Sequence, residues 1–79
     1  NTTALYVYPN PTSGAFNVET NKAFNQISIY DASGKLVYRD QFDSYTRNRS
    51  FDLILETGMY QILVTDQQGI QHTERLIIK

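Results

Sequence analysis

Residues 58–79 read GMYQILVTDQQGIQHTERLIIK and predict two β-strands joined by a tight turn at residues 67–69. In the first strand, Tyr60, Ile62 and Val64 fall on one face, while the opposite face also carries apolar side chains at residues 59 and 63. Apolar side chains on both faces indicate a central strand, since successive side chains point to opposite sides of a sheet. The second strand is expected at residues 70–79, with Lys79 and a chain-terminal carboxylate together at one corner of the sheet.

The preceding chain repeats the pattern of short apolar segments separated by turn residues. Earlier strands are expected at residues 5–8, 15–19, 26–30, 35–42 and 50–53. Residues 10–14 and 31–34 are turn clusters, and residues 20–23 and 43–49 are expected to be polar connections. No stretch has the period of a helix. The sequence therefore predicts an all-β fold, a single immunoglobulin-like antiparallel β-sandwich of about seven strands.

Length and composition agree with one small all-β domain. The 79 residues predict a linker remnant at residues 1–4 and one domain at residues 5–79. Six Tyr and four Phe favour strands, and the absence of cysteine leaves stability to the apolar core. A net charge of −1 argues against nucleic-acid binding. No apolar run reaches the roughly 20 residues of a membrane span, and no signal peptide is present, so an exported protein would carry this piece within a longer precursor.

The polar residues do not form a catalytic or metal-binding motif. His72 has no nucleophile at a fixed spacing, so a solvated strand histidine is expected. Asp31 and Asp66 occupy positions where turns favour aspartate. Asp40 and Asp43 come closest to a calcium loop but lack the spacing of one. The sequence predicts no catalytic residue, no metal and no cofactor.

Tyrosines are the best candidates for exposed binding residues. Tyr6, Tyr8, Tyr38 and Tyr45 could form a platform for sugar or protein, because these rings combine an apolar body with a polar tip. The alternative is that they cover an outer sheet face or pack at its rim. One hypothesis is therefore an immunoglobulin-like or fibronectin-like accessory module that binds carbohydrate or protein at the cell surface.

Three separated motifs, taken in order, resemble one known family. They are YPNP at residues 8–11 followed by a glycine at 14, ISIYD at 27–31 with GKLV at 34–37, and a final group of FDL at 51–53, GMY at 58–60, VTD at 64–66 and RLIIK at 75–79. This set is similar to the type A C-terminal sorting domain of the type IX secretion system of Bacteroidota. The polar segment 43–49 departs from the family pattern, and Arg75 stands where the family often has lysine.

The resemblance implies a function in transport rather than in catalysis. Such domains end large cargo proteins, which pass through the periplasm. An outer-membrane translocon recognises the domain, and a sortase-like protease then removes it at the cell surface. The family fold is a seven-stranded immunoglobulin-like sandwich. The implied partners are the translocon, the protease and the attached N-terminal cargo.

A last strand at a sheet edge offers unpaired N–H and C=O groups that another sheet could extend. We therefore hypothesise that the translocon recognises this edge, with Arg75, Ile77 and Lys79 as its contacts. Exposed edges also allow a strand-exchanged dimer. The remaining motif residues are predicted to be scaffold: Pro9, Asn10, Pro11, Gly14, Gly34, Gly58, Tyr60 and Gly69.

Overall fold

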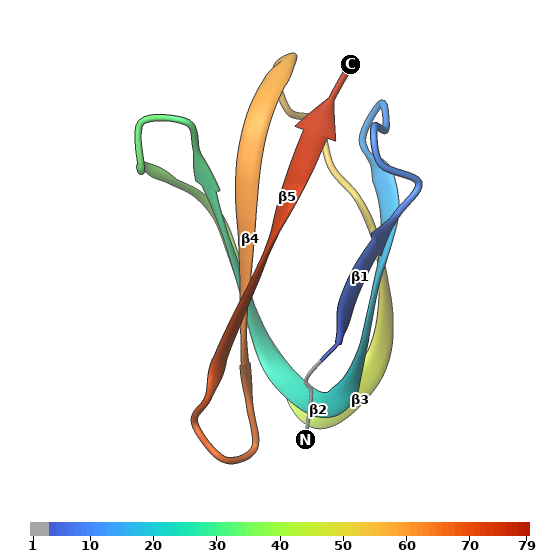
Figure 1. The fold of residues 1–79 in the computed structure, drawn as a ribbon, viewed down its shortest axis with the longest axis vertical. Helices are drawn as coiled ribbons and strands as arrows, with labels where there is room; N and C mark the ends of the chain where they lie inside the picture. Colours follow the sequence, from blue (N-terminus) through green and yellow to red (C-terminus); the bar gives the residue numbers. More distant parts are fainter. Residues whose placement is uncertain (1–3) are drawn as a thin grey trace.

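A computed structural model describes residues 4–79, which form five antiparallel strands and no helix (Figure 1). The strands are β1 (Leu5–Tyr8), β2 (Ala15–Asp31), β3 (Leu36–Asp52), β4 (Gly58–Asp66) and β5 (Gln71–Ile78). The all-β prediction is confirmed. Within the described residues, no helix has the length and hydrophobicity needed to cross a membrane.

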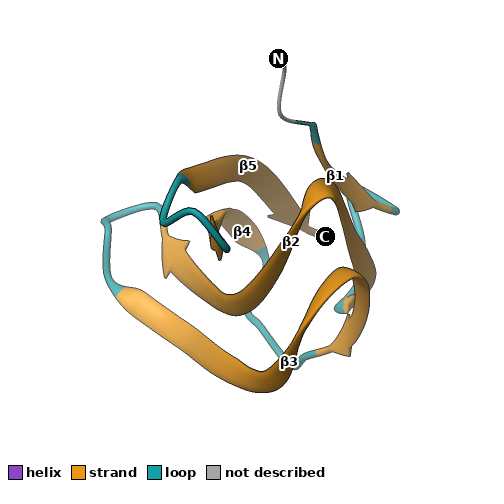
Figure 2. Ribbon diagram, turned by 90° about the horizontal axis from the view of Figure 1, so that it is seen from below, coloured by secondary structure: helices purple, strands orange, loops and turns teal. Residues whose placement is uncertain are grey.

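The long strand β2 organises the sheet. One edge of β2 pairs with β3 along its length, from Phe16 opposite Phe51 to Ile29 opposite Tyr38. The other edge pairs first with β1 and then, further along, with β4, which carries β5 on its far side. Because β2 and β3 bend together, the sheet curls and its two ends face each other around the core (Figure 2). The prediction that residues 59–66 form a central strand is confirmed by the pairing of β4 with β2 and β5.

The structure contains five strands instead of about seven, because two predicted connections are strand. Residues 20–23 lie inside β2 and residues 43–49 inside β3. The β2–β3 hairpin turns its corner at register shifts on either side of Phe24, where regular pairing is interrupted although both strands continue. Phe24 is fully buried at this corner and packs edge-on against Phe42 with ring centroids 5.9 Å apart. The polar residues of this corner therefore lie in strands that pack on a buried aromatic pair, Phe24 and Phe42.

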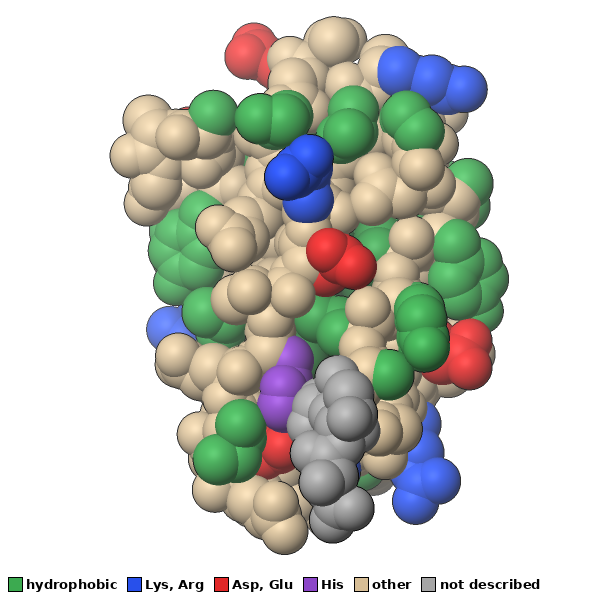
Figure 3. All heavy atoms as spheres, in the orientation of Figure 1, with side chains coloured by type: hydrophobic (Ala, Val, Ile, Leu, Met, Phe, Trp, Pro, Cys, Tyr) green, Lys and Arg blue, Asp and Glu red, His purple; other side chains and the backbone are tan. Residues whose placement is uncertain are grey.

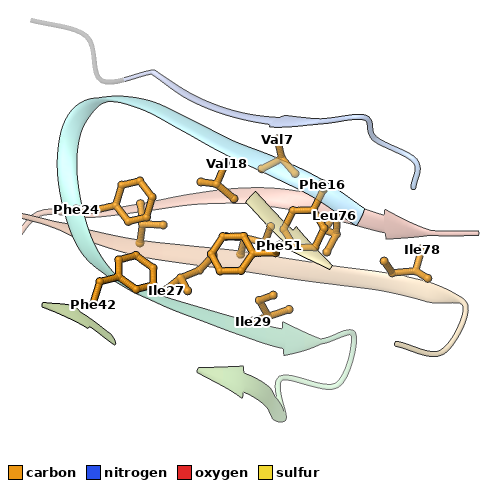
Figure 4. Packing of buried hydrophobic residues seen from close by; sticks show 12 residues of the cluster. Val7, Phe16, Val18, Phe24, Ile27, Ile29, Phe42, Phe51, Leu76 and Ile78 are labelled. Carbon is orange, nitrogen blue, oxygen red and sulfur yellow. The ribbon is translucent and has the colours of Figure 1, made fainter. Parts of the chain in front are cut away.

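The interior is one cluster of apolar side chains contributed by all five strands (Figure 4). Phe16 stacks on Phe51 at 5.5 Å, and Tyr38 meets Phe51 edge-on at 6.2 Å. Leu55 packs against the cluster from the segment between β3 and β4. Each fully buried side chain of this size contributes about 1.5–3 kcal/mol. The buried members are Val7, Phe16, Val18, Phe24, Ile27, Ile29, Phe42, Phe51, Ile62, Val64, Leu76 and Ile78.

Two hairpin turns share one design. Asp31 and Asp66 each end a strand, and Oδ1 of each accepts hydrogen bonds from the backbone N–H groups two and four residues later, at 2.8–3.0 Å. Gly34 and Gly69 follow at the same position in each turn, with φ of +88° and +82°. Hydrogen bonding by the Ser33 side chain lowers the pKa of the Asp31 carboxyl. The predicted turn roles of both aspartates are confirmed.

Candidate functional site

The outer side of β5 carries the predicted recognition residues. Leu76 and Ile78 are buried, so the alternating residues 75, 77 and 79 point away from the core. Arg75 and Lys79 are exposed, and Ile77 is half-buried. Met59 lies directly opposite Ile77 on β4 and is 52% exposed. Figure 3 shows a row of hydrophobic side chains across this end of the molecule, with Lys or Arg side chains beside it.

The side chain of Asn10 occupies the edge of β5. Its Nδ2 donates to the carbonyl of Arg75 at 2.7 Å, and its Oδ1 accepts from the N–H of Ile77 at 2.9 Å. A carboxamide holds N–H donors and a carbonyl acceptor in one plane, so it can bond to a strand edge as a peptide group does. Asn10 therefore pairs with β5 as one residue of an additional strand would.

The backbone of Thr12 continues this pairing. Its N–H donates to the carbonyl of Ile77 at 2.9 Å, and its carbonyl accepts from the N–H of Lys79 at 2.9 Å, which makes a parallel bridge opposite Ile78. We call residues 10–12 with these four hydrogen bonds the clamp. The expectation of an unpaired edge is wrong over residues 75–79, because the clamp supplies the partners that a neighbouring strand would supply.

Buried contacts behind the clamp fix its position. The Thr12 hydroxyl donates to the carbonyl of Ala15 at 2.6 Å and accepts from the N–H of Gly14 at 3.1 Å. The Gly14 carbonyl in turn accepts from the N–H of Leu53 at 2.9 Å. A Cβ on Gly14 would lie 2.3 Å from the Leu53 carbonyl oxygen, and φ at Gly14 is +140°, so glycine is required there. Sequence reasoning missed Thr12, which carries no motif signal.

The other predicted scaffold residues lie in different places. Pro9 and Pro11 flank Asn10, and the peptide bond before each is cis. Tyr60, on β4, donates its hydroxyl to the carbonyl of Glu56 at 2.7 Å. Gly58 begins β4, opposite Ile78, whereas Gly34 and Gly69 belong to the two hairpin turns. Asn10 thus connects the YPNP motif at residues 8–11 to the RLIIK motif at residues 75–79. Gly34 and Gly69 serve only the turns in which they lie.

A shallow hollow of about 420 Å³ adjoins the outer side of β5. Met59 and Gln61 of β4 and Arg75 of β5 line it, together with the Asp31 turn. Glu74 also lines the hollow, and its Oε1 accepts from the backbone N–H of Arg75 at 3.0 Å. The hollow therefore combines an exposed thioether, polar groups and a guanidinium.

His72 is not the solvated histidine that the sequence suggests. Its Nε2 lies 2.9 Å from Oδ2 of Asp66, and the two side chains are only 10% and 3% exposed. This hydrogen bond lowers the pKa of the Asp66 carboxyl, with further help from two backbone N–H groups. The pair fastens the β4–β5 hairpin near its turn. Within residues 4–79, no group of three or more potential ligands could hold a metal ion.

The four tyrosines do not form one platform. Tyr38 packs against Phe51 and belongs to the core side of β3. Tyr6 and Tyr8 are exposed on β1, and the Tyr8 hydroxyl donates to Glu19 at 2.8 Å, an interaction that raises the pKa of this tyrosine. Tyr45 is exposed at the bend of β3.

These features define a small curled all-β domain whose last strand is fixed by its first turn. The chain belongs to the secretion system C-terminal sorting domain family, whose model matches residues 6–79. This is the sorting domain of the type IX secretion system, so the resemblance seen in the sequence is confirmed.

Two known proteins illustrate the relationship. The chain is 31% identical over 78 residues to an endo-acting ulvan lyase of Formosa agariphila. The matched region covers 92% of this chain but only 14% of the lyase. The crystal structure of CopC from Methylosinus trichosporium OB3b matches 95% of this chain and 89% of its own, with a TM-score of 0.57 and 19% identity. The second likeness shows a shared fold alone.

Proposed function

We propose that this domain is an export signal that directs a cargo protein, attached on its N-terminal side, through the type IX machinery to the cell surface. The observation that carries the proposal is the family match over residues 6–79. The exposed basic side chains Arg75 and Lys79 supply contacts for an outer-membrane translocon, with Ile77 and Met59 between and beside them.

The cargo is a large secreted protein of which this domain is a small part. The related lyase supports this arrangement, since the chain spans about 14% of its length. In this proposal the cargo crosses the periplasm before it meets the translocon, and a sortase-like protease then separates cargo from domain within or before residues 1–4. Ala4 already pairs with Asn21 through hydrogen bonds of 2.9 and 3.2 Å, so a cut ahead of Ala4 leaves the sheet intact.

The domain acts by recognition and has no catalysis of its own. We also propose that the five strands form an immunoglobulin-like sandwich of about seven strand segments. The first half of β2 pairs with β1 and the second half with β4, and β3 bends with it, so each long strand serves two layers.

Export of a reporter tests the proposal. A folded reporter fused ahead of this domain should appear outside the cells of a Bacteroidota strain, at the cell surface or in the medium, and stay inside a matched strain that lacks the translocon. Equal release from both strains, or none from either, would refute the proposal.

Single substitutions test the basic contacts. Arg75→Ala and Lys79→Ala should each reduce release with little change in melting temperature, because exposed side chains contribute little to stability. Arg47→Ala is the matched control, since Arg47 is also exposed but lies on β3 near the opposite hairpin turn. Release that falls equally in the control would show that total charge, and not this surface, matters.

A further inference from the structure

We infer that the transport partner binds the outer face of the β5 end and not its edge, and that Asn10 is the positioning residue that makes this possible. The inference rests on the proposed function and deepens it. The face consists of Met59, Arg75, Ile77 and Lys79. The partner is a protein surface that presents carboxylates next to an apolar side chain.

The first step concerns the edge. A partner that adds a strand needs free N–H and C=O groups on alternate residues. At this end of β5, the outward carbonyl of Arg75, both groups of Ile77 and the N–H of Lys79 already have partners in the clamp. A strand added here would have to break four hydrogen bonds before making its own, so the edge offers no net gain in pairing.

The second step concerns the face. Met59 and Ile77 lie directly opposite each other and form one apolar spot, of which Met59 is 52% exposed. Arg75 and Lys79 flank Ile77 on the same side of β5, and within residues 4–79 neither makes an ion pair. Two unpaired cations around an apolar spot are complementary to carboxylates around an apolar side chain. The Arg75 guanidinium, which borders the hollow, can donate two hydrogen bonds to one carboxylate.

The third step concerns Asn10. Its side chain touches β5 only through backbone atoms, at residues 75 and 77. Loss of these bonds therefore changes no chemical group on the face. It does change how well the face is held, because Asn10 supplies two of the four hydrogen bonds along this edge of β5. Asn10 thus sets the position of the contact residues without being a contact itself.

The experiment compares export and amide exchange in the full cargo fusion. Asn10→Ala removes both side-chain hydrogen bonds. Asn10→Asp keeps an acceptor for the Ile77 N–H but places an oxygen against the carbonyl of Arg75. Two lost hydrogen bonds should accelerate exchange of the Ile77 amide by about tenfold or more. Export should fall in the same order as the loss of protection, with Asn10→Ala at least as impaired as Asn10→Asp.

Two controls separate positioning from general stability. Ser13→Ala changes an exposed side chain of the same turn and should leave both export and exchange unchanged. Ile62→Val weakens the core, with β5 still clamped, and serves as a variant of reduced stability. Export should remain high in Ile62→Val at a melting temperature equal to that of an impaired Asn10 variant.

The outcomes distinguish the inference from the function beneath it. Unchanged or increased export together with faster Ile77 exchange would mean that the partner uses the edge, and the inference would be wrong. Equal losses in Asn10→Ala and Ile62→Val would reduce Asn10 to a purely structural role and would also overturn it. If the unmodified fusion shows no translocon-dependent export, the proposed function fails and the inference falls with it.

Discussion

Alanine at Gly14 is expected to destabilise the domain far more than alanine at another glycine with positive φ. A Cβ at Gly14 would lie 2.3 Å from the carbonyl oxygen of Leu53, well inside van der Waals contact. That oxygen belongs to backbone, and the Leu53 N–H is itself bonded to the Gly14 carbonyl at 2.9 Å. Neither the segment at Gly14 nor the segment at Leu53 can move aside without losing this hydrogen bond and disturbing the turn that carries the clamp.

The size of the effect follows from three contributions. The positive φ costs about 1 kcal/mol for a residue with a side chain. The strained hydrogen bond contributes about 0.5–1.5 kcal/mol, and relief of the overlap about 1–3 kcal/mol. We therefore expect Gly14→Ala to lower the free energy of unfolding by roughly 3–5 kcal/mol. A domain of this size has only about 4–12 kcal/mol in total, so much of its stability would be lost.

Urea unfolding of the 79-residue chain, followed by circular dichroism, measures the change. Gly58→Ala is the matched control, because φ at Gly58 is +155° but no atom lies within 4 Å of the added Cβ. It should cost only about 1 kcal/mol. If the two variants unfold at the same urea concentration, the close approach of Gly14 to Leu53 does not determine stability and the reasoning is refuted.

Three other changes have expected outcomes. Because the pKa of Asp66 is lowered in the folded state, its contribution to stability is present above the unfolded value of about 3.9 and is lost as the pH falls through the lower folded value. Urea midpoints across this range should decline less steeply in Asp66→Asn than in the unmodified chain. An equal decline would contradict the role of the Asp66–His72 pair. Ile62→Ala should cost about 2–5 kcal/mol in thermal or urea unfolding, because Ile62 is fully buried, and a cost below that of Ile62→Val would be inconsistent with the core. Ile54→Ser should change stability by less than about 0.5 kcal/mol, since Ile54 is fully exposed, and a larger loss in the same assay would reveal an unrecognised contact.

Local patterns in the sequence were sufficient to predict most of the strands. The apolar pattern around Ile62 and Val64 identified a central strand, and Asp31 and Asp66 identified the two hairpin turns, because each of these signals depends on neighbouring residues only. Residues 43–49 were misassigned for a physical reason. Here β3 is an edge strand at an exposed bend, so its side chains are polar, as those of a loop would be.

The clamp could not be predicted from the same signals. Asn10 lies 65 residues from Arg75 and 67 from Ile77 in the chain, so no local pattern connects them. Its neighbours Pro9 and Pro11 follow β1, which ends at Tyr8 as expected. They also concealed a second role, because an asparagine between prolines already has an adequate explanation as a turn residue.

The long separation between Asn10 and β5 also has a consequence in time. Contacts between residues far apart in sequence must overcome a larger loop-closure entropy and tend to form late in folding. While the chain is synthesised from its N-terminus, the Asn10 side chain and the Thr12 backbone lack their partners on β5 until residues 75–79 have been made. We expect the finished β5 end to be among the last parts of the domain to form, so that a chain interrupted earlier does not present it.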